Sequence, residues 1–239
     1  KRGVRLDAGR LRYFFIAAAV SYAIPNLLML SALPHLGAGY VGIMYTLSTM
    51  FTLALSALFG IRRPNALGIA GILVGFTGVV LVAATRGEAG QPASLAWVGV
   101  GLLLPVFLAI GNIYRTWDWP KGADPIELAA GSHLAAGVLL TALALVLGVA
   151  GGAASLAEVP ALSLAQVASA AGMFAFYFQL QAVGGPVYLS QISYVGAAVA
   201  LVAGMLFLGE SYSALTWIGA AIIAVADEVK EQTPAAIAA

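Results

Sequence analysis

Long apolar runs alternate with short polar or turn-forming segments along the whole chain. The clearest run extends from Pro186 to Leu208 without a formal charge and ends at Gly209-Glu210. An α-helix of about 20 residues crosses the roughly 30 Å of hydrocarbon in a bilayer. Polar side chains gather in the first half of this run, whereas its second half is small and aliphatic. Because polar groups in a bilayer helix usually face protein or water, we expect a membrane helix with one hydrated end.

The same pattern predicts eight membrane spans. Glycines, prolines and charged residues separate them, and the longest polar separators are Thr85–Ser94 and Arg115–Asp124. The chain is therefore predicted to be an all-α polytopic membrane protein. The expected spans are Arg12–Leu33, Gly37–Phe59, Ala66–Ala84, Leu95–Tyr114, Pro125–Val149, Leu162–Val183, Pro186–Leu208 and Ala214–Ala226.

Composition agrees with this prediction and narrows the function. Hydrophobic residues make up 62% of the chain and charged residues only 9%, against about 45–50% and about 25% in globular domains. The net charge of +1 gives no case for nucleic acid, and the absence of cysteine excludes disulfides and thiolate metal sites. We expect a lipid bilayer and a small-molecule substrate as partners, a monomer or homodimer, and neither cofactor nor metal.

The basic residues predict an orientation. Cytoplasmic loops of membrane proteins are enriched in Lys and Arg. If the eight spans alternate and the N-terminal flank is inside, only Arg86 lies outside. Both ends would then be cytoplasmic in an inner (plasma) membrane. The basic residues on the inside would be Lys1, Arg2, Arg5, Arg10, Arg12, Arg62, Arg63, Arg115, Lys121 and Lys230.

The chain also contains a weak internal repeat. When Ile24–Gly60 is placed on Met173–Gly209, Tyr45 meets Tyr194 and Gly60 meets Gly209. Each copy has a span, a short turn, a second span with early polar residues and a glycine-ended stop. A repeat with an odd number of helices must be inverted across the membrane, which is a common transporter plan.

The second copy predicts a repeat unit of five helices. Residues 95–239 would form one complete unit, and residues 1–94 would hold the last three helices of the other. We therefore expect an inverted structural repeat of 5+5 transmembrane helices, with two further spans before Lys1. The polar halves of Pro186–Glu210 and His35–Gly60 would then enter the membrane from opposite faces.

Short motifs resemble the drug/metabolite transporter superfamily, in its EamA-type branch. The first motif is the helix end Leu206–Glu210 followed by Trp217-Ile218-Gly219, and the corresponding motif of the other repeat is Leu58-Phe59-Gly60 with Gly68 and Gly71. The segment Asn112–Arg115 is similar to the sixth helix of that family. The resemblance implies a ten-helix exporter of amino acids, including aromatic ones, or of other small metabolites or drugs. The proline that the family often carries inside the helices matching Gly37–Phe59 and Val187–Leu208 is absent here.

Polar side chains at bilayer depth are the candidates for substrate binding. Tyr22 and Asn26 share one helical face, and Tyr45, Thr49, Thr52 and Ser56 form a polar stripe beside Ser48. The alternative for such stripes is helix–helix packing, in which Ser and Thr are common. The expected cavity lining is Tyr22, Asn26, Tyr45, Ser48, Tyr177, Gln181, Gln191 and Tyr194.

His133 is the one titratable residue placed well inside a predicted span. It is a candidate for proton coupling, and the alternative is a packing residue hydrogen-bonded to Glu127 or Ser132. With no carboxylate expected inside the membrane, we predict facilitated or weakly coupled export by alternating access. Two other functions remain open, a non-transporting membrane scaffold or receptor and an intramembrane enzyme. The enzyme is disfavoured because neither a metal cage nor a catalytic triad is visible.

Overall fold

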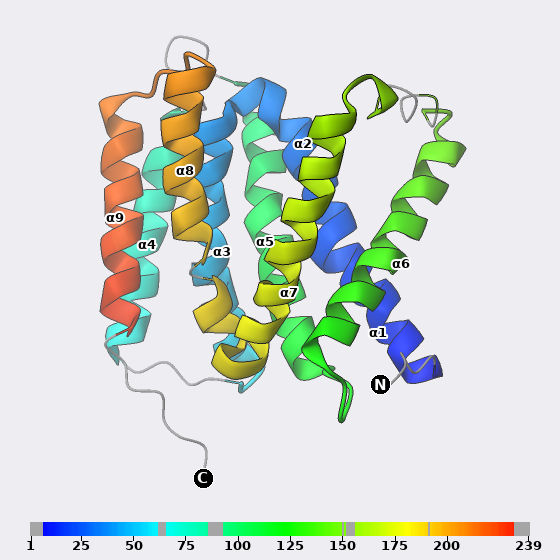
Figure 1. The fold of residues 1–239 in the computed structure, drawn as a ribbon. Helices are drawn as coiled ribbons and strands as arrows, with labels where there is room; N and C mark the ends of the chain where they lie inside the picture. Colours follow the sequence, from blue (N-terminus) through cyan, green and yellow to red (C-terminus); the bar gives the residue numbers. More distant parts are fainter. Residues whose placement is uncertain are drawn as a thin grey trace.

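The structure is a computed structural model that describes residues 7–61, 66–85, 93–149, 151, 156–190 and 192–231. The described residues form a bundle of long helices that run up and down side by side, so that α1 begins and α9 ends at the same end of the bundle (Figure 1). The helices are α1 (Ala8–Ala18), a π-helical turn (Ala19–Ala23), α2 (Ile24–Leu36), α3 (Ala38–Leu58), α4 (Ala66–Thr85), α5 (Leu95–Trp117), α6 (Pro125–Val146), α7 (Pro160–Ser190), α8 (Ile192–Phe207) and α9 (Ala214–Glu231).

Five helical stretches of the described residues are each long and apolar enough to cross a membrane. They are Ala8–Leu36, α3, α5, α6 and Pro160–Val187, while α4 and α9 contain shorter apolar stretches. The prediction of an all-α polytopic membrane protein is therefore confirmed. The predicted break between the sixth and seventh spans is Gly185, whose φ of 69° and ψ of −176° interrupt α7 before Pro186.

Local sequence signals start and stop these helices. Asp7 accepts a hydrogen bond from the backbone N–H of Arg10 and begins α1, and Asp124 does the same for Ile126 before Pro125 opens α6. Gly37 joins α2 to α3 with a φ of 83°, a conformation that glycine adopts at no steric cost. The chain can therefore reverse direction within one residue at this point.

Small residues bring two helix pairs into close contact. A Cβ added to Gly78 on α4 would lie 2.8 Å from the carbonyl oxygen of Gly219 on α9, and one added to Gly42 on α3 would lie 2.6 Å from Cβ of Ala200 on α8. Glycine and alanine allow helix backbones to approach closely in membranes. The chain thus pairs α4 with α9 and α3 with α8 at one side of the bundle, while α1 and α6 lie at the other side and α5 and α7 lie between (Figure 1).

Candidate functional site

A buried arginine lies at the centre of the candidate site. Arg115, in the last turn of α5, is 1% exposed. Its Nε donates to Oε1 of Gln181 on α7 at 2.7 Å, and its Nη2 donates to Oδ1 of Asn112 at 2.7 Å and to the hydroxyl of Tyr177 at 2.8 Å. The hydroxyl of Tyr177 in turn donates to the same Asn112 oxygen at 3.1 Å. These bonds hold the guanidinium between α5 and α7.

The network continues from these residues into neighbouring elements. Nε2 of Gln181 donates to the backbone carbonyl of Asn112 at 3.1 Å and to the hydroxyl of Thr116 at 3.0 Å. Nδ2 of Asn112 donates to the hydroxyl of Thr52 on α3 at 3.2 Å. Three helices are therefore connected through polar side chains inside an otherwise apolar bundle.

Aromatic rings surround the guanidinium. Its Cζ lies 5.0 Å from the ring centroid of Tyr177, 5.8 Å from that of Tyr22 and 5.8 Å from that of Phe178. Cation–π attraction at these distances stabilises a desolvated cation in part. Among the described residues, no carboxylate forms an ion pair with Arg115. The positive charge is thus enclosed without an opposite charge beside it.

The prediction that Arg115 begins a polar loop is wrong. The helix continues through it to Trp117, and Arg115 faces the bundle interior. Asn112 is also buried and belongs to the same network. The spacing of three residues, which places Asn112 and Arg115 on one helical face, is the sequence signal that could have identified them.

Tyr22 reaches the site because of the π-helical turn. This turn lies between α1 and α2, and Tyr22 is buried within it. Its ring centroid is 4.4 Å from that of His133 on α6 and 5.2 Å from that of Phe174 on α7. The centroids of His133 and Phe174 are 3.9 Å apart, and Phe174 also meets Tyr177 edge-on at 5.9 Å. These four rings, hereafter the aromatic wall, lie next to Arg115.

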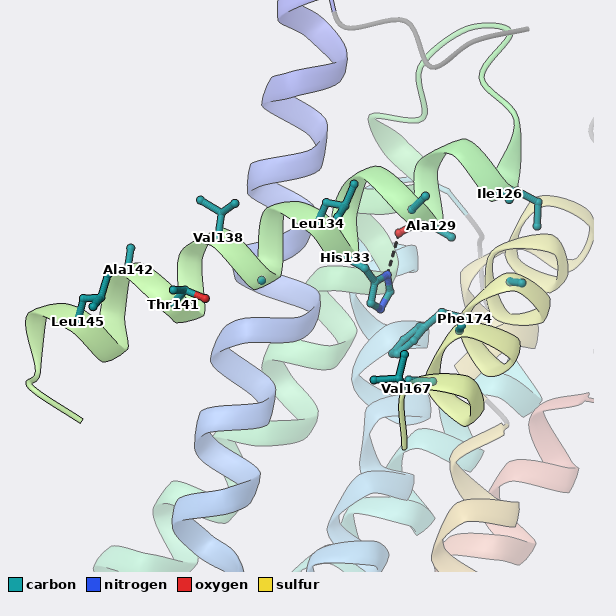
Figure 2. Close-up of a pocket in the computed structure, with 15 residues that line it drawn as sticks. Ile126, Ala129, His133, Leu134, Val138, Thr141, Ala142, Leu145, Val167 and Phe174 are labelled. Atoms are coloured by element: carbon teal, nitrogen blue, oxygen red, sulfur yellow. Dashed lines mark hydrogen bonds between the residues drawn. The ribbon is translucent and has the colours of Figure 1, made fainter. Parts of the chain in front are cut away.

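A cavity of about 1010 Å³ lies on the other side of the aromatic wall, between α6 and α7. His133 and Phe174 lie close together between the two helices, whereas Thr141, Ala142 and Leu145 lie on the part of α6 that runs away from α7 (Figure 2). Apart from His133 and Thr141 the lining is apolar. Leu134 and Val138 on α6 are 74% and 59% exposed. The cavity therefore opens along the side of the bundle.

His133 has a different partner from those considered in the sequence. Its Nδ1 lies 2.8 Å from the carbonyl oxygen of Ala129, one turn earlier on α6 (Figure 2). Its Nε2 is buried and has no hydrogen-bond partner among the described residues. Neither Glu127 nor Ser132 supplies its hydrogen bond. Glu127 instead forms an ion pair with the buried Arg10 and so connects α6 to α1.

The structure brings only some of the predicted lining residues together. Tyr22, Tyr177 and Gln181 all lie around Arg115. Ser48 is buried on α3, and Tyr45 is partly buried there beside the neighbouring core. Asn26 is exposed, and its amide donates to the carbonyl of Tyr22 in its own helix at 2.8 Å. Gln191 and the side chain of Tyr194 lie outside the described residues.

The polar parts of α3 and α8 meet at one level of the bundle. The hydroxyl of Thr49 on α3 lies 3.3 Å from that of Ser193 on α8, and Thr52 lies one turn further along α3. Ser193, in the first turn of α8, thus meets α3 near the middle of that helix. The expectation that the two polar halves enter the membrane from opposite faces stays a prediction.

The other end of the α3–α8 pair carries a second polar contact. Glu210, just after α8, accepts hydrogen bonds from the backbone N–H groups of Ala38 and Gly39 at 2.6 and 3.1 Å, and from the hydroxyl of Tyr212. Burial acts to raise the pKa of Glu210, but the Tyr212 hydroxyl and the two N–H groups outweigh it and hold that pKa below its ordinary value. The carboxylate thus stabilises the first turn of α3.

Comparisons with known proteins point to one family. Residues 2–84 match the model of the EamA-like transporter family. Over 198 residues the chain is 26% identical to a protein of Escherichia coli strain K12 named as the uncharacterized inner membrane transporter YedA, and proteins of the same name from Escherichia coli O6:H1 and O157:H7 match equally. The alignment covers 79% of this chain and 60% of each relative, so the chain spans less than two thirds of their length. The resemblance to EamA-type transporters is therefore confirmed, by a family match over residues 2–84 and by similarity to inner membrane transporters over most of the chain.

Proposed function

We propose that the protein is an inner-membrane transporter that exports small metabolites by alternating access. Its substrates would be amino acids, above all those with aromatic or other hydrophobic side chains, or related amphipathic compounds. The family match and the name of the relatives support transport across an inner membrane.

The observation that carries this proposal is the polar network around Arg115. Ionisable groups inside a membrane protein are costly and commonly mark a pathway for a solute or ion. Here the network lies beside a cavity of about 1010 Å³, and sites for small molecules commonly measure about 300–1,000 Å³. Aromatic faces and uncharged donors next to that cavity suit a solute that has both an apolar and a polar part.

The helix pairing supports the inverted-repeat plan. α3 and α8 correspond in the predicted repeat, as do α4 and α9, and each helix packs against its counterpart. Such pairs would lie near the axis that relates residues 1–94 to residues 95–239. In this plan Tyr22, Tyr177 and Gln181 bind the solute, Tyr45 and Ser48 line its path from the first repeat, and both chain ends are cytoplasmic. Asn26, Gln191 and Tyr194 stay predictions.

A counterflow assay tests the proposal. The purified protein is reconstituted in proteoliposomes preloaded with mixed unlabelled amino acids, and entry of each radiolabelled amino acid is followed. We expect accumulation of those with large apolar side chains. Tyr177→Ala should reduce it strongly because the ring contacts Arg115. Phe176→Ala is the matched control, since Phe176 is its neighbour on α7 and faces outwards. Counterflow of no amino acid, or equal activity of Tyr177→Ala and wild type, would contradict the proposal.

A further inference from the structure

Arg115 is a desolvated cation whose counter-charge is missing. A charge buried away from water is costly unless it is paired. Gln181, Asn112 and Tyr177 supply neutral acceptors, and three aromatic rings supply partial compensation. The nearest comparison within the chain is Arg10, which is also buried but forms an ion pair with Glu127. The chain thus satisfies one buried arginine with a carboxylate and leaves the other without one among the described residues.

The guanidinium also has unused donors. An arginine carries five N–H groups, two of them on Nη1. The bonds described above use Nε and Nη2, and Nη1 donates to none of the described residues. The hydroxyls of Tyr13 and Tyr22 are buried nearby, and each of them can donate or accept a hydrogen bond. The uncompensated charge of the guanidinium and the N–H groups of Nη1 therefore favour an anionic occupant.

We propose that Arg115 binds the carboxylate of a monoanionic or zwitterionic solute with an apolar body, a step that rests on the proposed transport function and names its substrate class. A carboxylate matches both the charge and the planar donor geometry of a guanidinium. A phosphate monoester carries up to two negative charges, whereas Arg115 is the one cation of the described network. The solute amine is not required, because no carboxylate of the described residues is available there to receive it.

The aromatic wall separates this site from the cavity between α6 and α7. Tyr22, His133 and Phe174 touch one another in ring-to-ring contact, and His133 and Phe174 also line the cavity. The structure therefore holds Arg115 in an occluded state. A solute in the cavity reaches the guanidinium when these rings separate, and its apolar body then remains against the alanines and leucines of α6 and α7.

A ligand series tests the charge requirement with the wild-type protein alone. The purified protein in detergent is heated with 3-phenylpropionate, phenylalanine, phenylalaninamide or phenylethylamine, and saturable shifts of the unfolding temperature are measured. The first two compounds carry a carboxylate and the last two do not. We expect both carboxylates to bind at least about tenfold more tightly than the amide, since hydrogen bonds to a charged group are strong. Equal binding of acid and amide, or no saturable binding of either carboxylate, would overturn the proposal.

Variants assign the preference to Arg115. Arg115→Gln should reduce the ratio of acid to amide affinity to about one, and Arg115→Lys should keep a preference with weaker binding because it keeps the charge but loses the planar fork. Arg12→Gln is the control, since Arg12 is exposed and pairs with Asp118; its ratio should match wild type. If Arg115→Gln does not fold, the ratio measured for Arg115→Lys decides. An unchanged affinity and ratio in either Arg115 variant would refute the assignment.

Counterflow of the same compounds separates this proposal from the transport function. Tight, Arg115-dependent binding of carboxylates without counterflow would leave the site standing and remove the transport function. Equal counterflow of phenylalanine and phenylalaninamide would leave the transport function standing and remove the proposed carboxylate site at Arg115.

Discussion

Arg115 on α5 and Gln181 on α7 are joined inside the bundle, with Nε of the arginine 2.7 Å from Oε1 of the glutamine. Nε2 of the same glutamine donates to two groups of α5, the carbonyl of Asn112 and the hydroxyl of Thr116. The buried side-chain amide of Gln181 therefore both accepts a hydrogen bond from α5 and donates hydrogen bonds to it. This relationship makes α5 and α7 depend on each other.

Gln181→Leu should destabilise the protein by about 1–3 kcal/mol, because it leaves the buried Nε of Arg115 without its acceptor and removes one of the hydrogen bonds to the carbonyl of Asn112. The unfolding midpoint in detergent measures this. Gln179→Leu is the control on the same helix, since Gln179 is exposed and its replacement should change stability by no more than about 0.5 kcal/mol. Equal effects of the two substitutions would show that the Arg115–Gln181 contact adds nothing to stability.

Gly78→Ala should weaken the packing of α4 on α9. The added Cβ would lie 2.8 Å from the backbone oxygen of Gly219, and a backbone atom cannot rotate away. Overpacking of this kind typically costs about 1–3 kcal/mol. Gly99→Ala, also within a helix, has open space around the added Cβ and should stabilise slightly through helix propensity. Thermal unfolding of both variants checks the prediction, which fails if Gly78→Ala is as stable as Gly99→Ala.

Glu210 should make stability depend on pH at the α3–α8 end of the bundle. Its pKa in the fold lies below the ordinary 4.5, so the ionised carboxylate contributes stability at neutral pH, and that contribution is lost as the pH falls through the folded-state pKa. Glu210→Gln should therefore be less stable than wild type at pH 7, by about 0.5–1 kcal/mol for a partly exposed helix cap. This difference in stability between wild type and Glu210→Gln should disappear towards pH 3.

Unfolding temperatures of wild type and Glu210→Gln between pH 7 and pH 3 measure that difference. Glu158→Gln provides the control, because Glu158 is exposed. A difference between wild type and Glu210→Gln that stays constant down to pH 3 would mean that Glu210 acts through shape rather than charge.

His133→Gln should leave the pH dependence of counterflow unchanged. Nδ1 of His133 is held by the carbonyl of Ala129, and the ring packs between Tyr22 and Phe174. These contacts suit a neutral imidazole in the aromatic wall better than a proton carrier. Counterflow of wild type and variant between pH 5.5 and pH 8 provides the measurement, with those values chosen about the ordinary histidine pKa of roughly 6.5. Loss of a pH-dependent step, with transport retained at one pH, would instead support proton coupling through His133.

Local preferences made most of the fold predictable. Gly60 and Gly209 both have positive φ and end helices where the sequence placed stops, because glycine tolerates this conformation better than other residues. Gly185 and Pro186 likewise interrupt α7 where a break was expected. Each of these boundaries depends on one or two neighbouring residues, so it can be read without tertiary information.

The site was less predictable because its contacts are not local. Arg115 looked like the start of a loop, since a charge normally ends an apolar span, and its burial depends on Tyr22, Tyr177 and Gln181 from distant segments. The contact of Thr49 with Ser193 also joins segments that are distant in the sequence, as does the hydrogen bonding of Glu210 to the start of α3. The sequence identified Tyr22, Tyr177 and Gln181 as inward-facing, but not the cation that they surround.

The π-helical turn at Ala19–Ala23 has a consequence for how the first helix can vary. A π-helical turn holds about one residue more than an α-helical turn, so everything before it is rotated by roughly 100° relative to an uninterrupted helix. Tyr13 and Tyr22 are both buried in one core cluster as a result. Deletion of a single residue from this turn would restore a regular helix and carry either Arg10 and Tyr13 or Tyr22 towards lipid. Length at this turn is therefore as constrained as side-chain identity, and homologues that lose one residue here must rebuild one half of the interface between α1 and α6.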